Sequence, residues 1–298
     1  MPGAGEVRVA IAFAGVNFID LYLRSGLYPS PSLPAIAGKE GAGVVDAVGP
    51  GVTSPRVGDR VAFFDGPGGY AERVVLGAAR TLPVPDGLGL DIAAALPLQG
   101  MTARMLIETI GRVGAGDLVL VHAAAGGVGL LACQLARRAG ARLFGTASTP
   151  EKAARARAAG CERVWRAEDD FASAILSETG GRGCDLVLDS VGKTTFAGSV
   201  RSTRMRGTLV LFGQSSGPVE PLSPRAVLGS RTLVTATLFD YLRDPLELAA
   251  SAAAVFGAAA RGELAVAIDR VLPLAEAAEA HRLLAGRATS GKLLLAIG

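Results

Sequence analysis

A single stretch near the middle of the chain, residues 117–139, limits most strongly what this chain can fold into. It begins with the apolar run Leu-Val-Leu-Val at 118–121, which suits a strand buried on both faces of a parallel sheet. A glycine turn follows, and the next apolar residues recur at helical spacing, at Val128, Leu131, Leu135 and Ala139. The stretch therefore predicts a buried strand, a tight turn and a helix in immediate succession.

The turn has the spacing of the dinucleotide-binding fingerprint G-x-G-x-x-G/A, with alanine in place of the first glycine. Ala124, Gly126 and Gly129 occupy its three positions. In such a turn Gly126 lets the backbone approach a pyrophosphate, Gly129 lets helix and strand pack closely, and the helix N-terminus offers N–H donors. The pattern favours nucleotide binding over the alternative, a glycine-rich connection in another kind of α/β domain.

The same stretch has a second interpretation, because residues 118–136 contain no Asp, Glu, Lys or Arg and resemble a membrane span. His122, Gln134 and the glycine cluster argue against it. A spanning helix has no use for a tight turn, so the strand-turn-helix interpretation is preferred.

Composition and charge place the chain among compact globular proteins. Half of its 298 residues are hydrophobic, enough for two domains with substantial cores. The net charge of +3 is small and no dense basic run occurs, so neither nucleic acid nor a membrane is an expected partner. Cys133, Cys161 and Cys184 are odd in number, lack metal-ligand spacing and are expected to be buried or partly buried. With no secretory signal at the N-terminus, we expect a cytoplasmic protein.

The chain has only two histidines, His122 and His281, without an H-E-x-x-H or C-x-x-C motif. This scarcity argues against a histidine-rich metal site and against a Ser-His-Asp triad. We interpret His122 as a polar residue at a strand end beside the turn, and His281 as a helix surface position.

Residues 5–96 are rich in turns and predict a small antiparallel barrel. Short strands are expected at 7–13, 43–48, 59–63 and 71–75, and a short helix at 17–24. The proline-rich segment 28–34 cannot form a central strand.

Strand and helix signals then alternate and predict an α/β fold with a doubly wound parallel sheet of strand order 3-2-1-4-5-6. A helix is expected at 93–110, another near 150, and further strands at 142–146, 163–166, 185–189, 208–212 and 231–238. The last strand is expected at the sheet edge, where it can pair with a second copy, so we predict a homodimer. The tail predicts a helix at 245–260, a strand at 267–272, a helix at 275–285 and a strand at 292–297, which return to the first domain.

With these motifs placed, the chain resembles the zinc-free quinone oxidoreductase (zeta-crystallin-like) branch of the medium-chain dehydrogenase/reductase superfamily. The resemblance covers nearly the whole chain. It rests on segments 15–20 (GVNFID), 24–29 (RSGLYP), 38–43 (GKEGAG), 57–61 (VGDRV) and 122–129 (HAAAGGVG), with DSVG at 189–192 and FG at 212–213. It implies a GroES-like substrate domain at 1–95, a Rossmann domain at 96–238 and a C-terminal segment, 239–298, that returns to the GroES-like domain.

Two departures accompany the resemblance. Zinc-dependent relatives have Cys where this chain has Asn17 and His where it has Lys39, and they insert a four-cysteine lobe that this chain lacks, so no catalytic metal is expected. Family members also begin with an additional strand pair, and we expect its absence to expose a barrel edge and part of the substrate-cleft wall.

The end of the second parallel strand favours NADPH. An NAD-preferring fold places an acid there, whereas this chain has Thr-Ala-Ser-Thr at 146–149. Lys152 and Arg166 follow and can converge on a 2′-phosphate, although Glu151 beside Lys152 weakens the argument. The alternative for both cations is a solvated surface charge.

The resemblance also implies a set of cofactor-binding residues. Asn17 and Thr102 border the nicotinamide, and Arg287 and Lys292 approach from the tail. The remaining residues are Ala125, Gly126, Gly127, Val128 and Gly129 for the pyrophosphate, Ser148, Lys152 and Arg166 for the adenosine end, and Phe212, Gly213 and Phe239 for the nicotinamide ribose. Core packing is the alternative for the two phenylalanines.

The function expected from this set is metal-free hydride transfer from NADPH to a quinone in the cleft between barrel and sheet. The candidate donors to the acceptor oxygen are Asn17, Tyr22 and Tyr28, and either tyrosine can instead serve packing. One alternative is an NADPH-dependent enone or enoyl-thioester reductase. Another, of a different class, is a non-catalytic NADPH-binding structural or RNA-binding protein.

Overall fold

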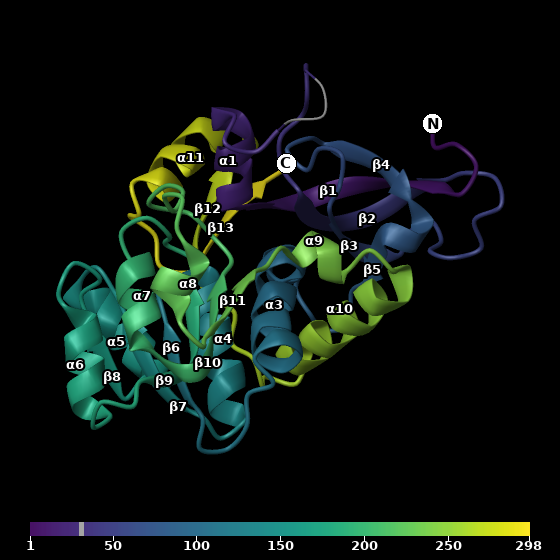
Figure 1. The fold of residues 1–298 in the computed structure, drawn as a ribbon. Coiled ribbons are helices and arrows are strands. Elements are labelled where there is room, and N and C mark those ends of the chain that lie inside the picture. Colours follow the sequence, from purple (N-terminus) through teal and green to yellow (C-terminus); the bar gives the residue numbers. More distant parts are fainter. Residues whose placement is uncertain (30–32) are drawn as a thin grey trace. The chain divides into compact units, whose positions relative to one another are not determined.

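The computed structural model describes residues 1–29 and 33–298, and the chain divides into two compact units (Figure 1). Unit 1 comprises Met1–Met101 and Tyr241–Gly298, and unit 2 comprises Thr102–Asp240. The prediction that segment 28–34 forms no central strand falls in part on residues 30–32, which lie outside the described residues.

Unit 1 is built on a seven-stranded mixed sheet of order β12-β13-β1-β2-β3-β5, with β4 paired to β1. Its strands are β1 (Glu6–Val16), β2 (Glu40–Val48), β3 (Arg60–Phe64), β4 (Arg73–Gly77), β5 (Thr81–Pro83), β12 (Ile268–Pro273) and β13 (Lys292–Ala296). Val7, Val9 and Ile11 alternate along β1 and pack against Val45 and Phe63 in one core. The four strands predicted in this region are confirmed, whereas the short β5 was not predicted.

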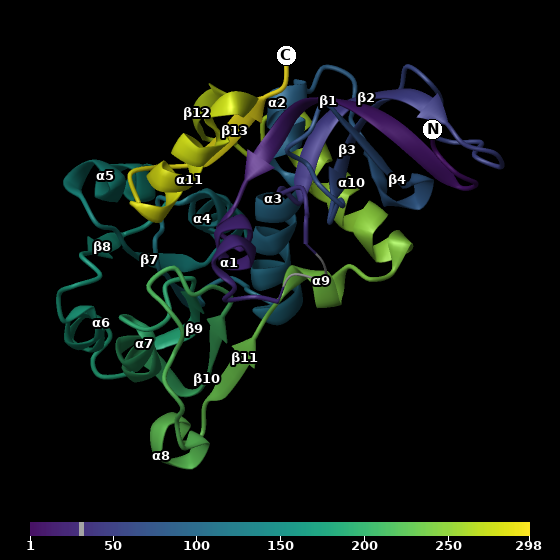
Figure 2. The same ribbon diagram turned by 90° about the horizontal axis from the view of Figure 1, so that it is seen from above.

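The C-terminal strands lie beside the N-terminal one (Figures 1 and 2): β13 pairs antiparallel with β1, and β12 runs parallel to β13. Helices α1 (Phe18–Ser25) and α11 (Ala277–Ala285) cover this edge. Leu21 of α1, Leu284 of α11 and Leu293 of β13 share a small core. The first and last segments of the chain therefore fold together.

Unit 2 is a six-stranded parallel sheet of order β11-β10-β9-β6-β7-β8, which confirms the predicted order 3-2-1-4-5-6. Its strands are β6 (Leu118–Val121), β7 (Arg142–Thr146), β8 (Arg163–Trp165), β9 (Cys184–Asp189), β10 (Thr203–Leu211) and β11 (Thr232–Thr235). Its main helices are α4 (Gly127–Arg138), α5 (Pro150–Ala158), α6 (Phe171–Glu178) and α7 (Phe196–Ser202), with the short α8 (Pro224–Leu228) before β11. All four residues of β6 are buried, as expected for a central parallel strand. Cys133, Cys161 and Cys184 are buried and free, which confirms the prediction made for them.

The predicted helix over residues 93–110 is wrong as a single element. The chain forms α2 (Leu90–Ala95), α3 (Pro97–Arg104) and a π-helical turn over Met105–Ile110. Pro97 explains the break between α2 and α3, because proline has no N–H to donate to the carbonyl four residues before it. The predicted strand at 231–238 is also too long: β11 ends at Thr235, opposite the last residue of β10, and α9 (Leu238–Tyr241) follows. The predicted helix over 245–260 is confirmed as α10 (Pro245–Ala260).

The apolar stretch 118–136 forms a four-residue strand, a turn and most of α4 rather than one long helix. Among the helices of residues 1–29 and 33–298, none combines the length and apolar character needed to cross a bilayer.

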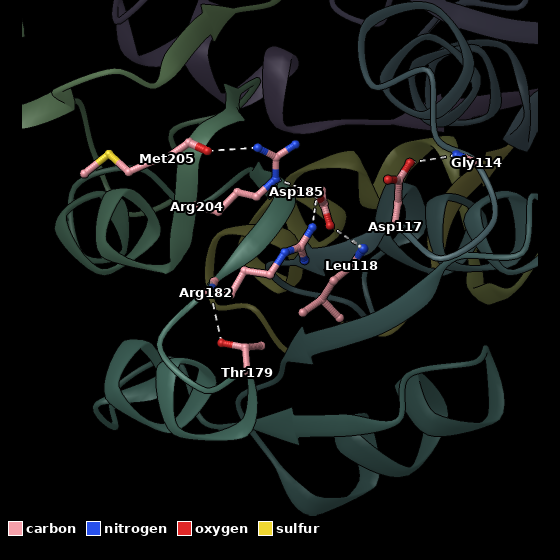
Figure 3. Close-up of polar contacts among 9 residues, drawn as sticks. Gly114, Asp117, Leu118, Thr179, Arg182, Asp185, Arg204 and Met205 are labelled. Carbon is pink, nitrogen blue, oxygen red and sulfur yellow. Dashed lines mark hydrogen bonds and ion pairs between the residues drawn. The ribbon is translucent and has the colours of Figure 1, made fainter.

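Asp185 holds together the start of the unit 2 sheet (Figure 3). Its carboxylate lies between the guanidinium groups of Arg182 and Arg204, at 2.6 Å and 2.5 Å, and accepts the Leu118 N–H at 2.9 Å. Strands β6, β9 and β10 are thus joined through one side chain. Burial raises the pKa of Asp185, but the hydrogen bonds from Leu118 and the two arginines outweigh it, and the net pKa is lowered.

Replacing Asp185 with Asn removes this charge and leaves two guanidinium groups beside a neutral amide. We expect Asp185→Asn to lower the free energy of unfolding at pH 7 by roughly 1–3 kcal/mol, measured by urea denaturation. Because the folded-state pKa is depressed, the stabilisation is present above about pH 4 and is lost as the pH falls through the folded pKa. The matched control is Glu162→Gln in the exposed Arg142 pair, with an expected cost below about 0.5 kcal/mol. Equal losses of unfolding free energy in the two variants would contradict the conclusion that Asp185 stabilises the sheet by joining its strands.

Candidate functional site

The predicted glycine turn lies at the carboxyl end of β6, between Val121 and α4. Ala123 adopts the left-handed conformation, with φ of 48°, and its carbonyl accepts the Gly126 N–H at 2.8 Å. The Ala124 N–H donates to the Thr146 carbonyl at the end of β7, at 3.0 Å. The turn is therefore tied both to itself and to the neighbouring strand.

Gly129 is required by the close approach of α4 to this turn. A Cβ at residue 129 would lie 2.4 Å from the Ala123 carbonyl oxygen and 2.9 Å from Ala124 Cα, both of them backbone atoms. A Cβ at Gly126 would lie 3.1 Å from the same oxygen, a milder contact. The first amides of α4 have no intrahelical partners, and the helix dipole makes this end positive. The arrangement suits a bound anion such as a diphosphate.

A buried chain of hydrogen bonds runs from the turn across the ends of three strands. Thr146 Oγ1 accepts the Ala123 N–H at 3.3 Å and lies 2.9 Å from His122 Nδ1. His122 Nε2 lies 3.0 Å from Ser199 Oγ, and that hydroxyl donates to Asp189 Oδ2 at 2.6 Å. Because Ser199 has one proton and gives it to the carboxylate, His122 must donate from Nε2 and accept the Thr146 hydroxyl at Nδ1.

The environment of His122 keeps the imidazole neutral. Burial lowers the pKa of His122, and the carboxylate of Asp189 opposes this only in part. Ser, His and Asp side chains do meet here, although the two histidines argued against a triad. Their order differs from that of a nucleophilic triad, because the serine proton is held by Asp189 rather than by the histidine. The group is therefore structural in its geometry.

A second polar group lies in unit 1, around a buried lysine. Lys292 Nζ donates to Asn17 Oδ1 at 2.7 Å and to Glu40 Oε1. Asn17 Nδ2 in turn donates to Glu40 Oε1 at 2.7 Å, and the Leu98 N–H donates to Glu40 Oε2 at 2.6 Å. Lys292 and Glu40 are both 0% exposed, so each charge is balanced mainly by the other. The Asn17 amide, predicted to face an acceptor oxygen, is bonded within this group.

Asp20, three residues after Asn17, belongs to a neighbouring chain of hydrogen bonds. Its Oδ2 accepts the Asn17 N–H at 2.8 Å and the Tyr70 hydroxyl at 3.0 Å. Tyr70 Oη lies 3.1 Å from His281 Nε2, and Arg24 donates to His281 Nδ1 at 3.1 Å. The interpretation of His281 as a helix surface residue is wrong, because its side chain is buried by Tyr70 and by the packing of α1 against α11.

The predicted contacts of the adenosine end lie after β7 and β8. Ser148 is exposed. The Thr149 side chain caps α5, because its Oγ1 accepts the N–H of the half-buried Lys152 at 3.3 Å. Arg166 is exposed and forms an ion pair with Glu168. The contact of Arg166 with a phosphate stays a prediction, and it requires the guanidinium to leave this carboxylate.

The remaining predicted residues are distributed over both units. Thr102 is buried at the start of unit 2, while Phe212 and Phe239 are half-buried. In unit 1, Tyr22 and Tyr28 are half-buried with ring centroids 5.1 Å apart, and Arg287 is exposed. Contact of these residues, of Gly213 and of Lys292 with a cofactor or an acceptor stays a prediction.

Sequence reasoning missed the residues that complete these hydrogen-bonded groups. They are Asp20, Glu40, Tyr70 and Arg24 in unit 1, and Thr146, Asp189, Thr195 and Ser199 in unit 2. One signal was present: Asp three residues after Asn17, before an apolar run, is the spacing of a helix N-terminal cap. The other partners are far apart in sequence and leave no local pattern.

Comparison with known proteins gives consistent results over both units. The family model described as "Alcohol dehydrogenase GroES-like domain" matches residues 3–86, and that described as "Zinc-binding dehydrogenase" matches residues 127–257. A quinone oxidoreductase of Pseudomonas aeruginosa is 45% identical, over 99% of this chain and 92% of the relative. A 2-haloacrylate reductase of a Burkholderia species is 39% identical, over 99% and 91%. The crystal structure of Escherichia coli quinone oxidoreductase complexed with NADPH superposes with a TM-score of 0.95, at 37% identity, over 99% and 92%.

One of these descriptions mentions zinc, and the residues present do not fit that metal. By the resemblance to zinc-dependent relatives, Asn17 is expected at the position of their cysteine ligand, and its amide is bonded to Glu40 and Lys292. By the same resemblance, Lys39 is expected at the position of their histidine ligand, and it pairs with Asp65 at 3.2 Å. An ammonium group cannot bind a metal cation, and thiolate and imidazole are the ligands that zinc prefers. Within residues 1–29 and 33–298, no group of three or more His, Cys, Asp and Glu side chains is arranged to hold a metal.

The buried carboxyl of Asp20 makes stability depend on pH. Burial raises its pKa to about 6, and Oδ1 has no hydrogen-bond partner within the described part of the chain. The unfolded value is about 3.9, so the contribution of Asp20 to stability is present below about pH 4 and lost as the pH rises through about 6.

Asp20→Asn removes this titrating group. Its free energy of unfolding relative to wild type should therefore rise between pH 4 and pH 7, by on the order of 2 kcal/mol, in urea titrations. A difference that stays constant with pH would contradict a raised pKa.

Proposed function

The chain belongs to the quinone oxidoreductase branch of the medium-chain dehydrogenase/reductase superfamily, and on that premise we propose that it reduces quinones with NADPH and without a metal ion. The observation that carries the proposal is the glycine turn. There the first turn of α4 lies so close to the backbone of Ala123 and Ala124 that residue 129 has no room for a side chain. The NADPH complex of the Escherichia coli enzyme supports it, because that structure shares this fold.

NADPH fits the residues of unit 2. Ala125 and the backbone from Gly126 to Gly129 would hold the diphosphate, with the amides of α4 as donors. When bound, NADPH supplies the hydride. The chain itself binds and orients the dinucleotide and offers donors to the acceptor.

The extra phosphate of NADPH would bind at the carboxyl end of β7. Residues 146–149 contain no carboxylate to repel it, and Ser148 is exposed there. Lys152 in the first turn of α5 and Arg166 after β8 are the two cations proposed for it. Moving Arg166 from Glu168 to the phosphate costs little free energy, because exposed ion pairs such as this one contribute little to stability.

The acceptor oxygen requires a hydrogen-bond donor, and we assign this role to Tyr22 or Tyr28. Their rings are in contact at 5.1 Å, and the Tyr28 N–H donates to the Tyr22 carbonyl at 3.1 Å, so the two phenols form one unit. Asn17 acts in this proposal by bordering the nicotinamide, while its amide stays bonded to Glu40 and Lys292.

A second candidate is the reduction of a conjugated carbonyl, as an NADPH-dependent enone or enoyl-thioester reductase. The 2-haloacrylate reductase of Burkholderia favours it, because its named substrate has a carbon–carbon double bond conjugated to a carboxyl group. Hydride transfer to either acceptor needs the same dinucleotide geometry and a donor to the acceptor oxygen.

We further propose a cytoplasmic homodimer that pairs through β11. This strand is the edge of the unit 2 sheet, where unpaired backbone groups can meet the same strand of a second copy.

A panel of acceptors separates the candidate functions. Purified protein with NADPH should turn over 9,10-phenanthrenequinone and 1,4-benzoquinone faster than a short 2-enone or crotonyl-CoA, and treatment with EDTA should leave the rate unchanged. Turnover of the enone or the thioester alone would replace quinone reduction by the second candidate. NADPH binding without turnover of any acceptor would favour a non-catalytic binding protein, and inactivation by EDTA would contradict metal-free transfer.

Lys152→Ala should weaken NADPH much more than NADH, because only NADPH has the 2′-phosphate. Loss of one charge-assisted hydrogen bond predicts roughly a 10- to 100-fold rise in the dissociation constant of NADPH. Fluorescence titrations with both dinucleotides measure it, and Lys193→Ala, which removes a surface lysine paired with Glu220, is the control. Equal losses for the two dinucleotides would remove Lys152 from the phosphate site.

A further inference from the structure

We propose that His122 is a positioning residue for the dinucleotide: through Thr146 it holds the strained turn at Ala123 in the conformation that receives the diphosphate. The inference rests on the proposed function and names the side chains that keep its binding turn in place. His122 does not touch the cofactor in this proposal, and it acts through the backbone.

The strain is located at Ala123. Its φ of 48° is in the left-handed region, which is unfavourable for a residue with a Cβ and persists only where surrounding contacts impose it. The Thr146 hydroxyl is one of these contacts, because it accepts the Ala123 N–H at 3.3 Å. The Ala123 carbonyl is in turn the group against which α4 packs at Gly129. A shift at Ala123 therefore displaces the start of α4.

The Thr146 hydroxyl can hold Ala123 only if its own proton points elsewhere. Its acceptor is His122 Nδ1, at 2.9 Å. Nδ1 is free to accept because the histidine proton is on Nε2, which donates to Ser199 Oγ at 3.0 Å. Each hydrogen bond in this chain thus determines the direction of the next, and the turn depends on the tautomer of His122.

The series of hydrogen bonds that begins at Ala123 ends at the carboxylate of Asp189, and both oxygens of that carboxylate accept hydrogen bonds. Asp189 Oδ1 accepts the N–H groups of Val191 and Gly192, at 2.8 Å and 2.9 Å, and both of its oxygens accept the Thr195 hydroxyl. Asp189 therefore shapes the loop after β9 as well as anchoring Ser199. This series of hydrogen bonds joins the carboxyl ends of β6, β7 and β9. Dinucleotides bind at this edge of such a sheet.

Two substitutions of similar chemistry separate positioning from packing. The amide oxygen of Asn can occupy the place of Nδ1, so His122→Asn keeps an acceptor for Thr146 and gives up the bond to Ser199. The amide nitrogen of Gln reaches the place of Nε2, so His122→Gln keeps the bond to Ser199 and leaves the Thr146 proton without its acceptor. Gln fills more of the histidine volume than Asn. If His122 serves packing alone, His122→Gln should bind the dinucleotides more tightly than His122→Asn. If His122 positions the turn, His122→Asn should bind them more tightly than His122→Gln.

The readouts are the dissociation constants of NADPH and NADH, from fluorescence titration, and the melting temperature. We expect His122→Gln to raise both dissociation constants by about tenfold, equally for the two dinucleotides because they share the diphosphate. For His122→Asn, both dissociation constants should stay within about threefold of wild type. This variant should nevertheless melt at a lower temperature than His122→Gln, because Asn fills less of the histidine volume. Thr146→Val should weaken binding at least as much as His122→Gln, and Thr146→Ser should restore it.

The control is Val45→Ala, because Val45 is buried in a core of unit 1 that contains none of the residues predicted to bind the cofactor. It should lower the melting temperature and leave both dissociation constants unchanged. The inference is overturned if His122→Asn weakens binding as much as His122→Gln or more, or if neither variant changes binding. Wild-type protein that binds no NADPH would overturn the proposed function itself, a result distinct from either of these.

Discussion

The contact between the first turn of α4 and the carbonyl of Ala123 leaves no room for a side chain, and the rest of unit 2 is arranged around it. A Cβ at residue 129 would come within 2.4 Å of that oxygen, so only glycine allows helix and turn to meet. This meeting directs the free amides of the helix N-terminus toward the sheet edge formed by the ends of β6 and β9. Binding of a diphosphate follows from the backbone, and side chains serve to keep that backbone in place.

Both histidines of the chain are buried as neutral imidazoles by the same arrangement of hydrogen bonds. Each lies buried with its Nε2 proton donated to a hydroxyl, Ser199 or Tyr70, and that hydroxyl donates to a buried carboxylate, Asp189 or Asp20. Burial lowers the pKa of both imidazoles, so neither adds a charge to the interior. The two carboxylates differ: Asp189 is fully bonded, whereas Asp20 has one bare oxygen and a raised pKa. The polar interior is thus ordered by the direction of protons as much as by charge.

The sequence predicted what depends on local pattern and missed what depends on long-range pairing. The apolar run at 118–121 and the glycine spacing after it predicted β6, the turn and α4, and alternation of strand and helix predicted the sheet order. Pro97 is a local signal too, and it divides the predicted helix over 93–110 into α2 and α3. The bond between Lys292 and Asn17 spans 275 residues, and that between His122 and Ser199 spans 77, so neither leaves a periodic signal. For this reason Asn17 was predicted as a donor to an acceptor, and its bonded state in the structure was not foreseen.

The amides at the start of α4 are proposed to receive the diphosphate of NADPH. The most direct test is to follow the backbone amide resonances of isotope-labelled protein while NADPH is added. We expect saturable shifts at Gly127, Val128 and Gly129, among the largest in the spectrum, with the same shifts for NADH at higher concentration. Saturation by NADPH with these three resonances unmoved would contradict it.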